Sequence, residues 1–306
     1  MPTNQGTSSI LGVIDLGTNT FHLLIAELDG EGGFREIYRE RRFVKLAEEG
    51  IERIGEGPWQ RGLAAMIAFA EQIDRLGAQR VRAIGTAALR TAVNGRQFVQ
   101  AVGVRTGLTI ELIDGQEEAL LIHRGASLAV PFGPEPRLLM DIGGGSVEFI
   151  LADAKQVYWS DSFPIGVAVL FRDFHHRDPL TEEEVAALRL FLAKALQPLH
   201  TVLQENPVTE LVGASGTFDV LETYLVDRTN PVPLPVNRIA PFRDQLIHMP
   251  LADRLQMTDM PPARAEMLPV ALVLLDVVIE LAQIQYVHVS PYALKEGVLA
   301  EMVQEV

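Results

Sequence analysis

The 306-residue chain has no cysteine, which excludes a disulfide framework, thiolate metal ligands and a cysteine nucleophile. Lysine is scarce too, because 22 of the 26 basic residues are arginines. The 40 acidic residues outnumber the basic ones and give the chain a net charge of -14. A general nucleic-acid binder needs a basic domain. The composition therefore argues against nucleic acid as a partner.

The sequence also lacks the segments that direct a chain to a membrane. Met1–Ser9 is polar and has no basic start followed by an apolar run, so we expect no signal peptide. The most apolar stretch, Met267–Ile284, contains Pro269, Asp276 and Glu280. A membrane span of this length carries few or no charges. We therefore expect a buried helix there, no membrane partner and a cytoplasmic protein.

Length and composition predict a folded protein of about two domains, since 48% of the residues are hydrophobic and 22% are charged. Apolar runs alternate with stretches of helical periodicity, which is typical of an α/β fold. A capping box at Thr181 and Glu184 marks one helix start, and Thr229–Pro241, with four prolines, is expected to be a connector. The expected strands are 10–14, 21–28, 81–85, 109–113, 137–140, 147–151 and 208–212. The expected helices are 63–76, 96–105, 116–128, 185–203, 217–226, 267–283 and a last one from 293.

The charge is unevenly distributed along the chain. Residues 1–124 hold 14 basic and 16 acidic residues, whereas residues 125–306 hold 12 and 24. Basic clusters lie at residues 39–45 and 80–96, and a solvated surface is the simplest interpretation for most of their side chains. An acidic protein can still bind a polyanion where backbone amides, a metal and a few arginines set the potential of one cleft.

An internal repeat carries the strongest functional signal. Val13–Thr20 matches Leu139–Ser146 position by position: an apolar strand, an Asp, and a small-residue turn closed by a hydroxyl. Glycines let a backbone approach an oxyanion, and the turn N–H groups donate to it. A matched pair favours a phosphate site over two ordinary hairpin turns. The candidate phosphate-binding residues are Asp15, Gly17, Thr18, Asn19, Thr20, Gly143, Gly144, Gly145 and Ser146.

A carboxylate in such a turn would repel phosphate unless it binds a divalent cation. Mg²⁺ is the natural candidate, because it uses one or two carboxylates together with substrate oxygens. No Walker A pattern occurs, which removes the commonest rival phosphate cradle. Gly213–Thr217 follows an expected strand and begins an expected helix, so its N–H groups suit an anion or a nucleotide. Close packing of a helix on a strand would give the same pattern. The candidates in this turn are Gly213, Ser215, Gly216 and Thr217.

Six ordered segments resemble the exopolyphosphatase/guanosine pentaphosphate phosphohydrolase (Ppx/GppA) family, within the superfamily of actin, sugar kinases and heat-shock chaperones. They are GVIDLGTNTFHLLIAEL, IGTAALRTAVNG, IELIDGQEEALLIHRG, LLMDIGGGSVEFIL, VGASGT and SPYALKEGVL. The resemblance implies a duplicated α/β, actin-like and ribonuclease H-like fold in its short two-domain form, with an interdomain active-site cleft. The expected domains are 1–122 and 123–306, and a last helix at about 293–306 is expected to pack on the first domain.

The resemblance also implies roles for individual residues. Glu118 matches a glutamate taken as the general base, and its place in the first turn of a helix would keep it ionised. Arg90 matches an arginine that contacts phosphate, and Asp141 and Glu148 match residues associated with the metal. Leu120 stands where the family has an arginine, so this chain departs from the family pattern at that position.

The expected function is metal-dependent hydrolysis of the terminal phosphoanhydride of inorganic polyphosphate, with Mg²⁺ or another divalent cation. Guanosine pentaphosphate is the close alternative, because it also presents a terminal phosphoanhydride. More distant alternatives are an actin-like ATPase or kinase, and a non-catalytic sensor of polyphosphate or an alarmone. The sequence leaves the oligomeric state open, with a homodimer as one alternative.

Overall fold

The computed structural model describes residues 9–29, 33–226 and 232–305, and these residues form two compact units. The first unit takes the chain up to Asp114 and again from Leu294, and the second takes Gly115–Ala293. The boundary thus falls immediately before the helix α4, whereas the sequence placed it after residue 122, inside that helix. The last helix belongs to the first unit.

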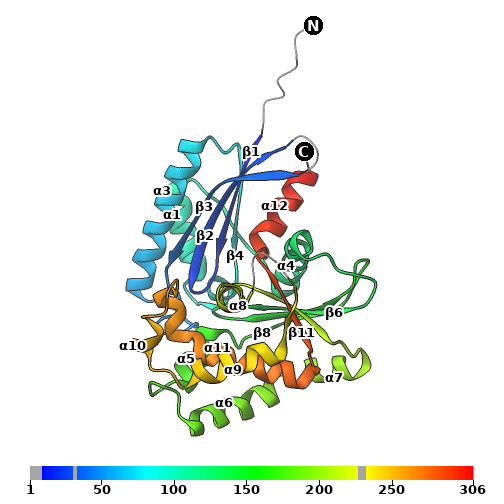
Figure 1. The fold of residues 1–306 in the computed structure, drawn as a ribbon. Helices are drawn as coiled ribbons and strands as arrows, with labels where there is room; N and C mark the ends of the chain where they lie inside the picture. Colours follow the sequence, from blue (N-terminus) through cyan, green and yellow to red (C-terminus); the bar gives the residue numbers. More distant parts are fainter. Residues whose placement is uncertain (1–8, 30–32, 227–231, 306) are drawn as a thin grey trace. The chain divides into compact units, whose positions relative to one another are not determined.

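The first unit contains a five-stranded sheet in the order β3-β2-β1-β4-β5 (Figure 1). The strands are β1 (Ile10–Leu16), β2 (Thr20–Leu28), β3 (Phe34–Phe43), β4 (Arg80–Gly85) and β5 (Ile110–Leu112). The helices are α1 (Glu56–Leu76), α2 (Ala87–Thr91), α3 (Gly95–Thr106) and α12 (Leu294–Gln304). Strands β1 to β3 are antiparallel neighbours, and β4 and β5 extend the sheet in parallel with β1.

The second unit contains a six-stranded sheet in the order β10-β11-β9-β6-β7-β8. The strands are β6 (Arg137–Ile142), β7 (Val147–Ala152), β8 (Val157–Phe163), β9 (Glu210–Ala214), β10 (Leu234–Pro235) and β11 (Tyr286–Ser290). The helices are α4 (Gly115–Ala129), α5 (Val167–Phe174), α6 (Glu182–Ala195), α7 (Gln197–Glu205), α8 (Gly216–Leu225), α9 (Val236–Ile247), α10 (Leu251–Arg254) and α11 (Pro262–Ala282).

The two sheets share one topology, which confirms the duplicated α/β fold. Strands β6 to β8 are antiparallel neighbours, and β9 and β11 run parallel to β6, as β4 and β5 do to β1. Each sheet therefore places its strands in the order third, second, first, fourth, fifth, and β10 is an addition to the second. The helix after each fifth strand also corresponds, because α4 packs on β7 and β8 and α12 packs on β1 and β2.

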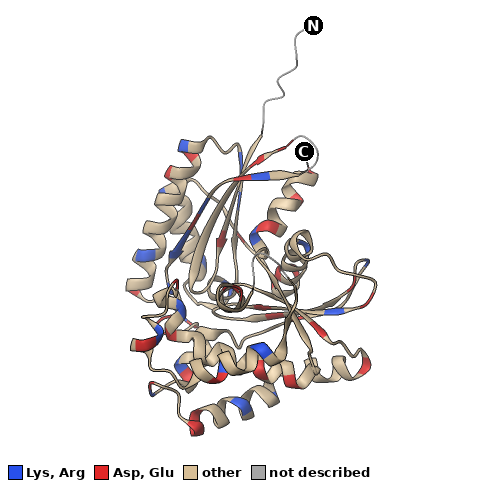
Figure 2. Cartoon of the chain, in the orientation of Figure 1, with Lys and Arg blue, Asp and Glu red and all other residues tan. Residues whose placement is uncertain are grey.

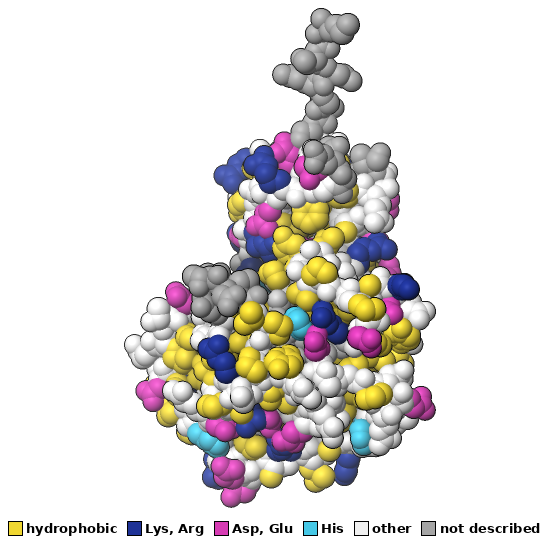
Figure 3. Space-filling model, turned by 45° about the vertical axis from the view of Figure 1, so that its right-hand side comes forward, with side chains coloured by type: hydrophobic (Ala, Val, Ile, Leu, Met, Phe, Trp, Pro, Cys, Tyr) yellow, Lys and Arg dark blue, Asp and Glu magenta, His cyan; other side chains and the backbone are white. Residues whose placement is uncertain are grey.

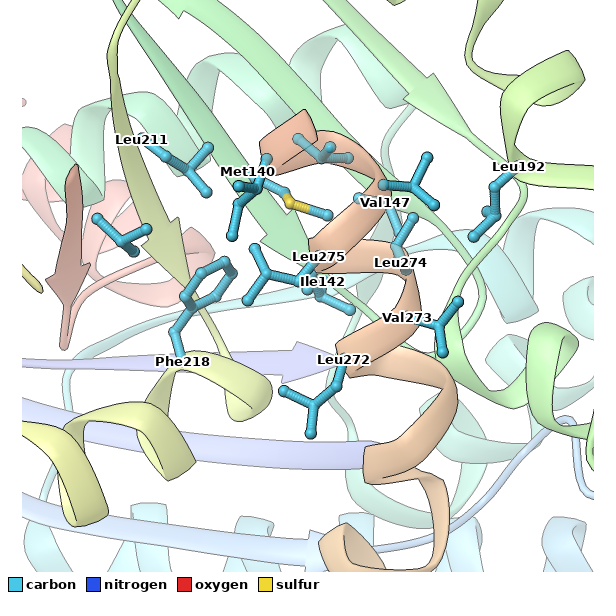
Figure 4. Packing of buried hydrophobic residues seen from close by; sticks show 14 of the residues in the cluster. Met140, Ile142, Val147, Leu192, Leu211, Phe218, Leu272, Val273, Leu274 and Leu275 are labelled. Carbon is cyan, nitrogen blue, oxygen red and sulfur yellow. The ribbon is translucent and has the colours of Figure 1, made fainter. Parts of the chain in front are cut away.

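The core of the second unit is built around α11, the apolar helix expected from Met267 onwards. Its side chains Leu272, Val273, Leu274 and Leu275 are buried against strands of the sheet and neighbouring helices (Figure 4). Met140 of β6 is one of the strand residues in this cluster. Within the part of the chain that the structure describes, no helix has the length and hydropathy needed to span a membrane.

The long helix predicted over residues 185–203 is two helices, and that prediction is wrong. Leu196 ends α6 and precedes α7, whose first turn contains Pro198. Proline lacks the N–H that a continuous helix would need at this position, so the hydrogen-bond ladder is interrupted. The apolar period passes through the break because Leu192, Leu196 and Leu199 all remain buried in the same cluster.

The connector predicted over Thr229–Pro241 is wrong where the structure describes it. Residues 229–231 lie outside the described residues and residues 232–233 have no regular structure, but β10 and the first half of α9 occupy residues 234–241. Pro241 sits inside α9. The burial of Ile239, Leu246 and Ile247 holds this helix in place, which shows tertiary packing overriding a local helix breaker.

The basic clusters of the first unit are largely paired with carboxylates. Three arginines bind acidic side chains in or directly after α12, in the pairs Arg39–Glu296, Arg80–Glu305 and Arg82–Glu301. Figure 2 shows both signs of charge on β3 and on α12, and in Figure 3 both signs are interspersed over the visible face. The arginines thus help to attach α12 to its sheet.

The capping box of α6 gives a stability prediction. Thr181 accepts a hydrogen bond from the Glu184 N–H, and the Glu184 carboxylate accepts one from the Thr181 N–H. Thr181→Ala removes the cap, so we expect the free energy of unfolding to fall by about 1 kcal/mol. Chemical denaturation measures the change. Thr201→Ala, at an exposed helical threonine, is the matched control, and an equal effect of both variants would contradict the capping role.

Candidate active site

Asp141 and Glu148 lie directly opposite each other on the antiparallel strands β6 and β7. Directly paired residues point to the same face of a sheet, with Cβ atoms about 4.5–5.5 Å apart. The neighbouring pair, Met140 and Phe149, points into the hydrophobic cluster around α11. The two carboxylates therefore share the other face of the sheet. Only 5% of Asp141 and 2% of Glu148 are exposed.

Ser162 of β8 extends this pair into a row across three strands. It is the register partner of Glu148, and its hydroxyl donates a hydrogen bond of 2.7 Å to Glu148 Oε1. A buried carboxylate is costly unless hydrogen bonds or cations compensate its charge. Ser162 compensates one oxygen of Glu148 and fixes the orientation of the carboxylate.

The start of α4 lies against the same row. A Cβ atom at Gly115 would come within 2.6 Å of the Ser162 Cβ, so only glycine allows this approach. Gln116 then bonds Ser160, donating to its carbonyl oxygen at 2.9 Å and accepting from its hydroxyl at 2.8 Å. These contacts fix the first turn of α4 against the edge strand β8.

Glu118 lies on the side of α4 that is turned towards the sheet. It is 6% exposed and shares the buried side of the helix with Ala119 and Ile122, whereas Glu117 is exposed. The helix packs on β7 and β8, the strands of Glu148 and Ser162. The helix dipole stabilises a carboxylate in this first turn. The second unit thus contains three of the predicted acidic residues: Asp141 and Glu148 paired on β6 and β7, and Glu118 on the helix that packs on β7 and β8.

Leu120 faces away from this site, with 53% of its surface exposed. Its side chain lies on the solvent side of α4, together with Glu117. The side chain of an arginine at this position would leave the helix on its solvent-exposed side. The burial of the carboxylates therefore does not depend on an arginine at position 120.

The glycine loop between β6 and β7 is a tight turn. The Gly143 N–H donates to the Ser146 carbonyl oxygen at 3.0 Å. A Cβ atom at Gly143 would lie 2.8 Å from that oxygen, so the turn needs glycine there. Ser146 is buried at the end of the loop.

The loop between β1 and β2 is closed in the same way in the first unit. The Gly17 N–H donates to the Thr20 carbonyl oxygen at 3.1 Å. Asp15 occupies the position of Asp141, but its register partner is His22, a residue of another chemical type than Glu148. Of the two hairpins, the second one pairs two carboxylates. This difference places the candidate metal centre in the second unit.

Asp141 and Glu148 fit a hard divalent cation. Mg²⁺ is held by one or two carboxylates and completes its coordination with water and phosphate oxygens. Across residues 9–29, 33–226 and 232–305, no group of three or more His, Cys, Asp and Glu side chains is arranged to hold a metal. A two-carboxylate site that is completed by water and phosphate oxygens is compatible with this finding.

Arg90 lies in the short helix α2 of the first unit. Its Nη1 donates to the carbonyl oxygen of Ile113 at 2.7 Å, just after β5. This bond holds the guanidinium at the carboxyl end of a parallel strand, where ligands of α/β sheets commonly bind. Contact of Arg90 with phosphate stays a prediction.

The turn before α8 is shaped by packing. A Cβ atom at Gly213 would overlap the Phe218 ring at 2.0 Å, and one at Gly216 would overlap the Arg264 guanidinium. Ser215 between them has φ 69° and ψ -171°, a conformation that side chains rarely adopt. Packing therefore accounts for both glycines, and anion binding at Gly213, Ser215, Gly216 and Thr217 stays a prediction.

Gly213 gives a test of this packing. Gly213→Ala forces Phe218 out of place, and we expect a loss of at least about 1–3 kcal/mol in the free energy of unfolding, as for overpacked cores. Denaturant unfolding measures the loss. Gly133→Ala is the control, because nothing lies within 4 Å of a Cβ atom there. Wild-type stability of Gly213→Ala would contradict the close contact.

Sequence reasoning missed Gly115 and Ser162. Ser162 lies in the edge strand β8, whose residues VYWSDSF show no clear apolar alternation. Gly115 is visible as a glycine at the start of an expected helix, but the sequence does not show that it approaches Ser162.

Comparison with known proteins places this geometry in a family. Residues 24–306 match the Ppx/GppA phosphatase family. A curated relative from Photobacterium profundum, guanosine-5'-triphosphate,3'-diphosphate pyrophosphatase, is 29% identical over 300 residues. That match covers 97% of this chain, which spans 60% of the relative's length.

Solved structures agree with this match. An exopolyphosphatase from Cytophaga hutchinsonii ATCC 33406 has a TM-score of 0.92 at 34% identity, covering 97% of this chain and 99% of that one. The Aquifex aeolicus member of the Ppx/GppA family has a TM-score of 0.79 at 26% identity, covering 97% and 98%. Since the family match extends over most of the sequence, this chain belongs to the Ppx/GppA phosphatase family.

Proposed function

We propose that this protein hydrolyses the terminal phosphoanhydride of inorganic polyphosphate and releases phosphate with the help of a divalent cation. The observation that carries the proposal is the row of Asp141, Glu148 and Ser162 beside the buried side of α4 that holds Glu118. A metal-binding carboxylate pair and a separate carboxylate next to one glycine-rich loop are the parts that phosphoanhydride hydrolysis needs.

In this proposal Asp141 and Glu148 hold Mg²⁺, which supplies charge neutralisation for the phosphate oxygens when bound. The amides of the Gly143–Gly145 loop and the hydroxyl of Ser146 donate hydrogen bonds to the phosphoryl group. Ser162 keeps Glu148 oriented. The matching loop of the first unit, with Asp15, Gly17, Thr18, Asn19 and Thr20, and Arg90 are proposed to bind further phosphates.

Glu118 is proposed to orient the attacking water and to accept its proton. A general base must be ionised and positioned, and Glu118 is held in the first turn of a helix that is fixed to β8. Phosphoryl transfer depends mainly on positioning and on neutralisation of charge. The base therefore contributes one part of the rate, and the loop and the cation contribute the rest.

We favour polyphosphate over guanosine pentaphosphate as the candidate substrate, because the similar exopolyphosphatase structure matches this chain at 34% identity over 99% of its own length. The pyrophosphatase relative makes guanosine pentaphosphate the second candidate, although this chain spans only 60% of that protein.

Phosphate release from polyphosphates of several lengths, guanosine pentaphosphate and ATP, each with Mg²⁺ or with EDTA, tests the proposal. We expect Mg²⁺-dependent release with the highest kcat/KM on polyphosphate. A higher kcat/KM on guanosine pentaphosphate would select the second candidate. Transfer of phosphate from ATP to a second substrate, or binding of polyphosphate without release, would overturn the hydrolase.

A further inference from the structure

The carbonyl groups of the second glycine loop are all held by the segment that begins α5. The N–H groups of Val167, Ala168 and Gly166 donate to the carbonyl oxygens of Gly143 at 3.0 Å, Gly144 at 2.9 Å and Gly145 at 3.2 Å. No two donors share a carbonyl in this set, so the orientation of each peptide plane in the loop is fixed separately.

Fixing the carbonyls also fixes the direction of the amides. A trans peptide is planar, and its C=O and the following N–H point in opposite directions. When the carbonyls of Gly143, Gly144 and Gly145 turn towards α5, the N–H groups of Gly144, Gly145 and Ser146 turn to the opposite side of the loop. Several successive N–H groups on one side form a concave donor set for an anion.

Gly166 is the residue that permits this contact. A Cβ atom at position 166 would lie 2.4 Å from the carbonyl carbon and oxygen of Gly144 and 2.5 Å from the carbonyl carbon of Gly145. These atoms are backbone and cannot rotate away. Any side chain at position 166 therefore pushes the loop off the α5 amides.

The first unit repeats the arrangement independently. There the residues directly after β3 donate to the first loop: the N–H groups of Val44 and Lys45 bind the Asn19 carbonyl oxygen, both at 2.9 Å, and that of Leu46 binds the Thr18 carbonyl oxygen at 2.7 Å. Lys45 adopts a left-handed backbone with φ 52° at this point. In each unit the segment after the third strand thus holds the carbonyls of the glycine-containing loop.

We propose that Gly166 and the Val167 N–H are positioning elements of the active site, which aim the amides of the second loop at the phosphoryl group in the transition state. This inference rests on the proposed hydrolase function. It predicts that changes at these positions lower kcat, although neither side chain belongs to the metal-binding or proton-accepting groups.

Two variants test the inference, Gly166→Ala and Val167→Pro. Gly166→Ala adds the clashing Cβ atom. Val167→Pro removes the N–H that binds Gly143 and exchanges a partly buried valine side chain for a proline ring. Proline suits the backbone here, because position 167 is the first residue of α5 and Gly166 before it is extended at φ -63° and ψ 161°. The controls are Gly133→Ala, with open space around the Cβ position, and Glu182→Pro, at the first residue of α6.

We expect kcat on polyphosphate to fall roughly 10–100-fold in both test variants. This fall approaches the reduction in kcat that removal of one preorganised hydrogen-bond donor causes. KM should change by less than about threefold, because aimed donors act mainly in the transition state. Val167→Pro should remain folded at the assay temperature, and its melting temperature should fall below that of Glu182→Pro because it also loses the packing of a partly buried valine. Both controls should retain wild-type kcat.

If both test variants keep kcat within about twofold of an active wild type, the inference is wrong. If Gly166→Ala does not fold, Val167→Pro decides alone. The inference would also be overturned if Val167→Pro lost activity only because part of the protein unfolds. In that case the melting temperature falls and the fraction of active protein falls with the activity, while kcat per active site is unchanged. A wild type that releases no phosphate from any phosphoanhydride would instead overturn the proposed function.

Discussion

Glu118→Gln is expected to lower kcat for phosphate release by about 10²–10⁴-fold, the usual contribution of a general base. The change keeps the size and shape of the side chain and removes its ability to accept a proton. Because Glu118 is buried in α4 between fixed neighbours, the amide should occupy the same place. Steady-state phosphate release gives kcat, and thermal unfolding verifies that the variant is folded.

Glu117→Gln is the matched control for this variant, because it changes the same residue type one position earlier, on the exposed side of the same helix. It should retain kcat within about twofold. The assignment of Glu118 as proton acceptor would be wrong if Glu118→Gln released phosphate at a near-normal rate, or if both variants lost activity equally.

Asp141→Asn and Glu148→Gln should each raise the Mg²⁺ concentration for half-maximal activity by at least about 10–100-fold. That range is typical for losing even an outer-shell partner of a metal ligand, so loss of a ligand sets it as a lower bound. Both variants exchange a charged oxygen donor for a neutral amide of the same shape. Calorimetric titration of the protein with Mn²⁺ in the absence of substrate measures metal binding independently of turnover.

Two further variants, Ser162→Ala and Asp173→Asn, test whether metal binding depends specifically on Asp141 and Glu148. Ser162→Ala leaves both carboxylates but removes the hydrogen bond to Glu148, so its effect should be smaller than that of Glu148→Gln. Asp173→Asn, at an exposed aspartate of α5, should leave Mn²⁺ binding unchanged. Equal metal binding by wild type, Asp141→Asn and Glu148→Gln would exclude the pair as the metal site.

The two candidate phosphate loops could be predicted from the sequence because they sit between strongly patterned strands, whereas the roles of Glu118, Arg90, Asp141 and Glu148 came from the family resemblance and stay predictions. The repeat of an apolar run, an Asp and a small-residue turn is visible at Val13–Thr20 and Leu139–Ser146. Once these runs are read as hairpins, the pairing of Asp141 with Glu148 follows from the turn length. Consecutive helical residues diverge by about 100°, so only one of Glu117 and Glu118 can face the site. The family resemblance selects Glu118.

The sequence patterns did not predict the edge strands β3 and β8. Strands β3 and β8 end their sheets, and their sequences FREIYRERRF and VYWSDSF carry charged or polar side chains in place of an apolar alternation. Such side chains are common on edge strands because they discourage pairing with other chains. The same feature hides the strand from pattern reading, and with it the support that Ser162 gives to Glu148.

Contacts between distant segments were also beyond the sequence. Gly115 against Ser162 and Gly166 against Gly144 are set by tertiary packing, in which a glycine is needed because of what it approaches. Pattern reading finds the glycine but not its neighbour. Three arginines of β3 and β4 illustrate the same limit, because acidic partners of Arg39, Arg80 and Arg82 lie more than 200 residues later, in or directly after α12.

The most direct test of the central claim is phosphate release from polyphosphate in H₂¹⁸O, followed by mass spectrometry of the product. If Glu118 activates water beside a cation at Asp141 and Glu148, each released phosphate should carry one ¹⁸O atom. Labelled product should require Mg²⁺ and should fall with kcat in Glu118→Gln. Released phosphate without ¹⁸O, or labelled phosphate formed at the same rate in EDTA, would contradict the account.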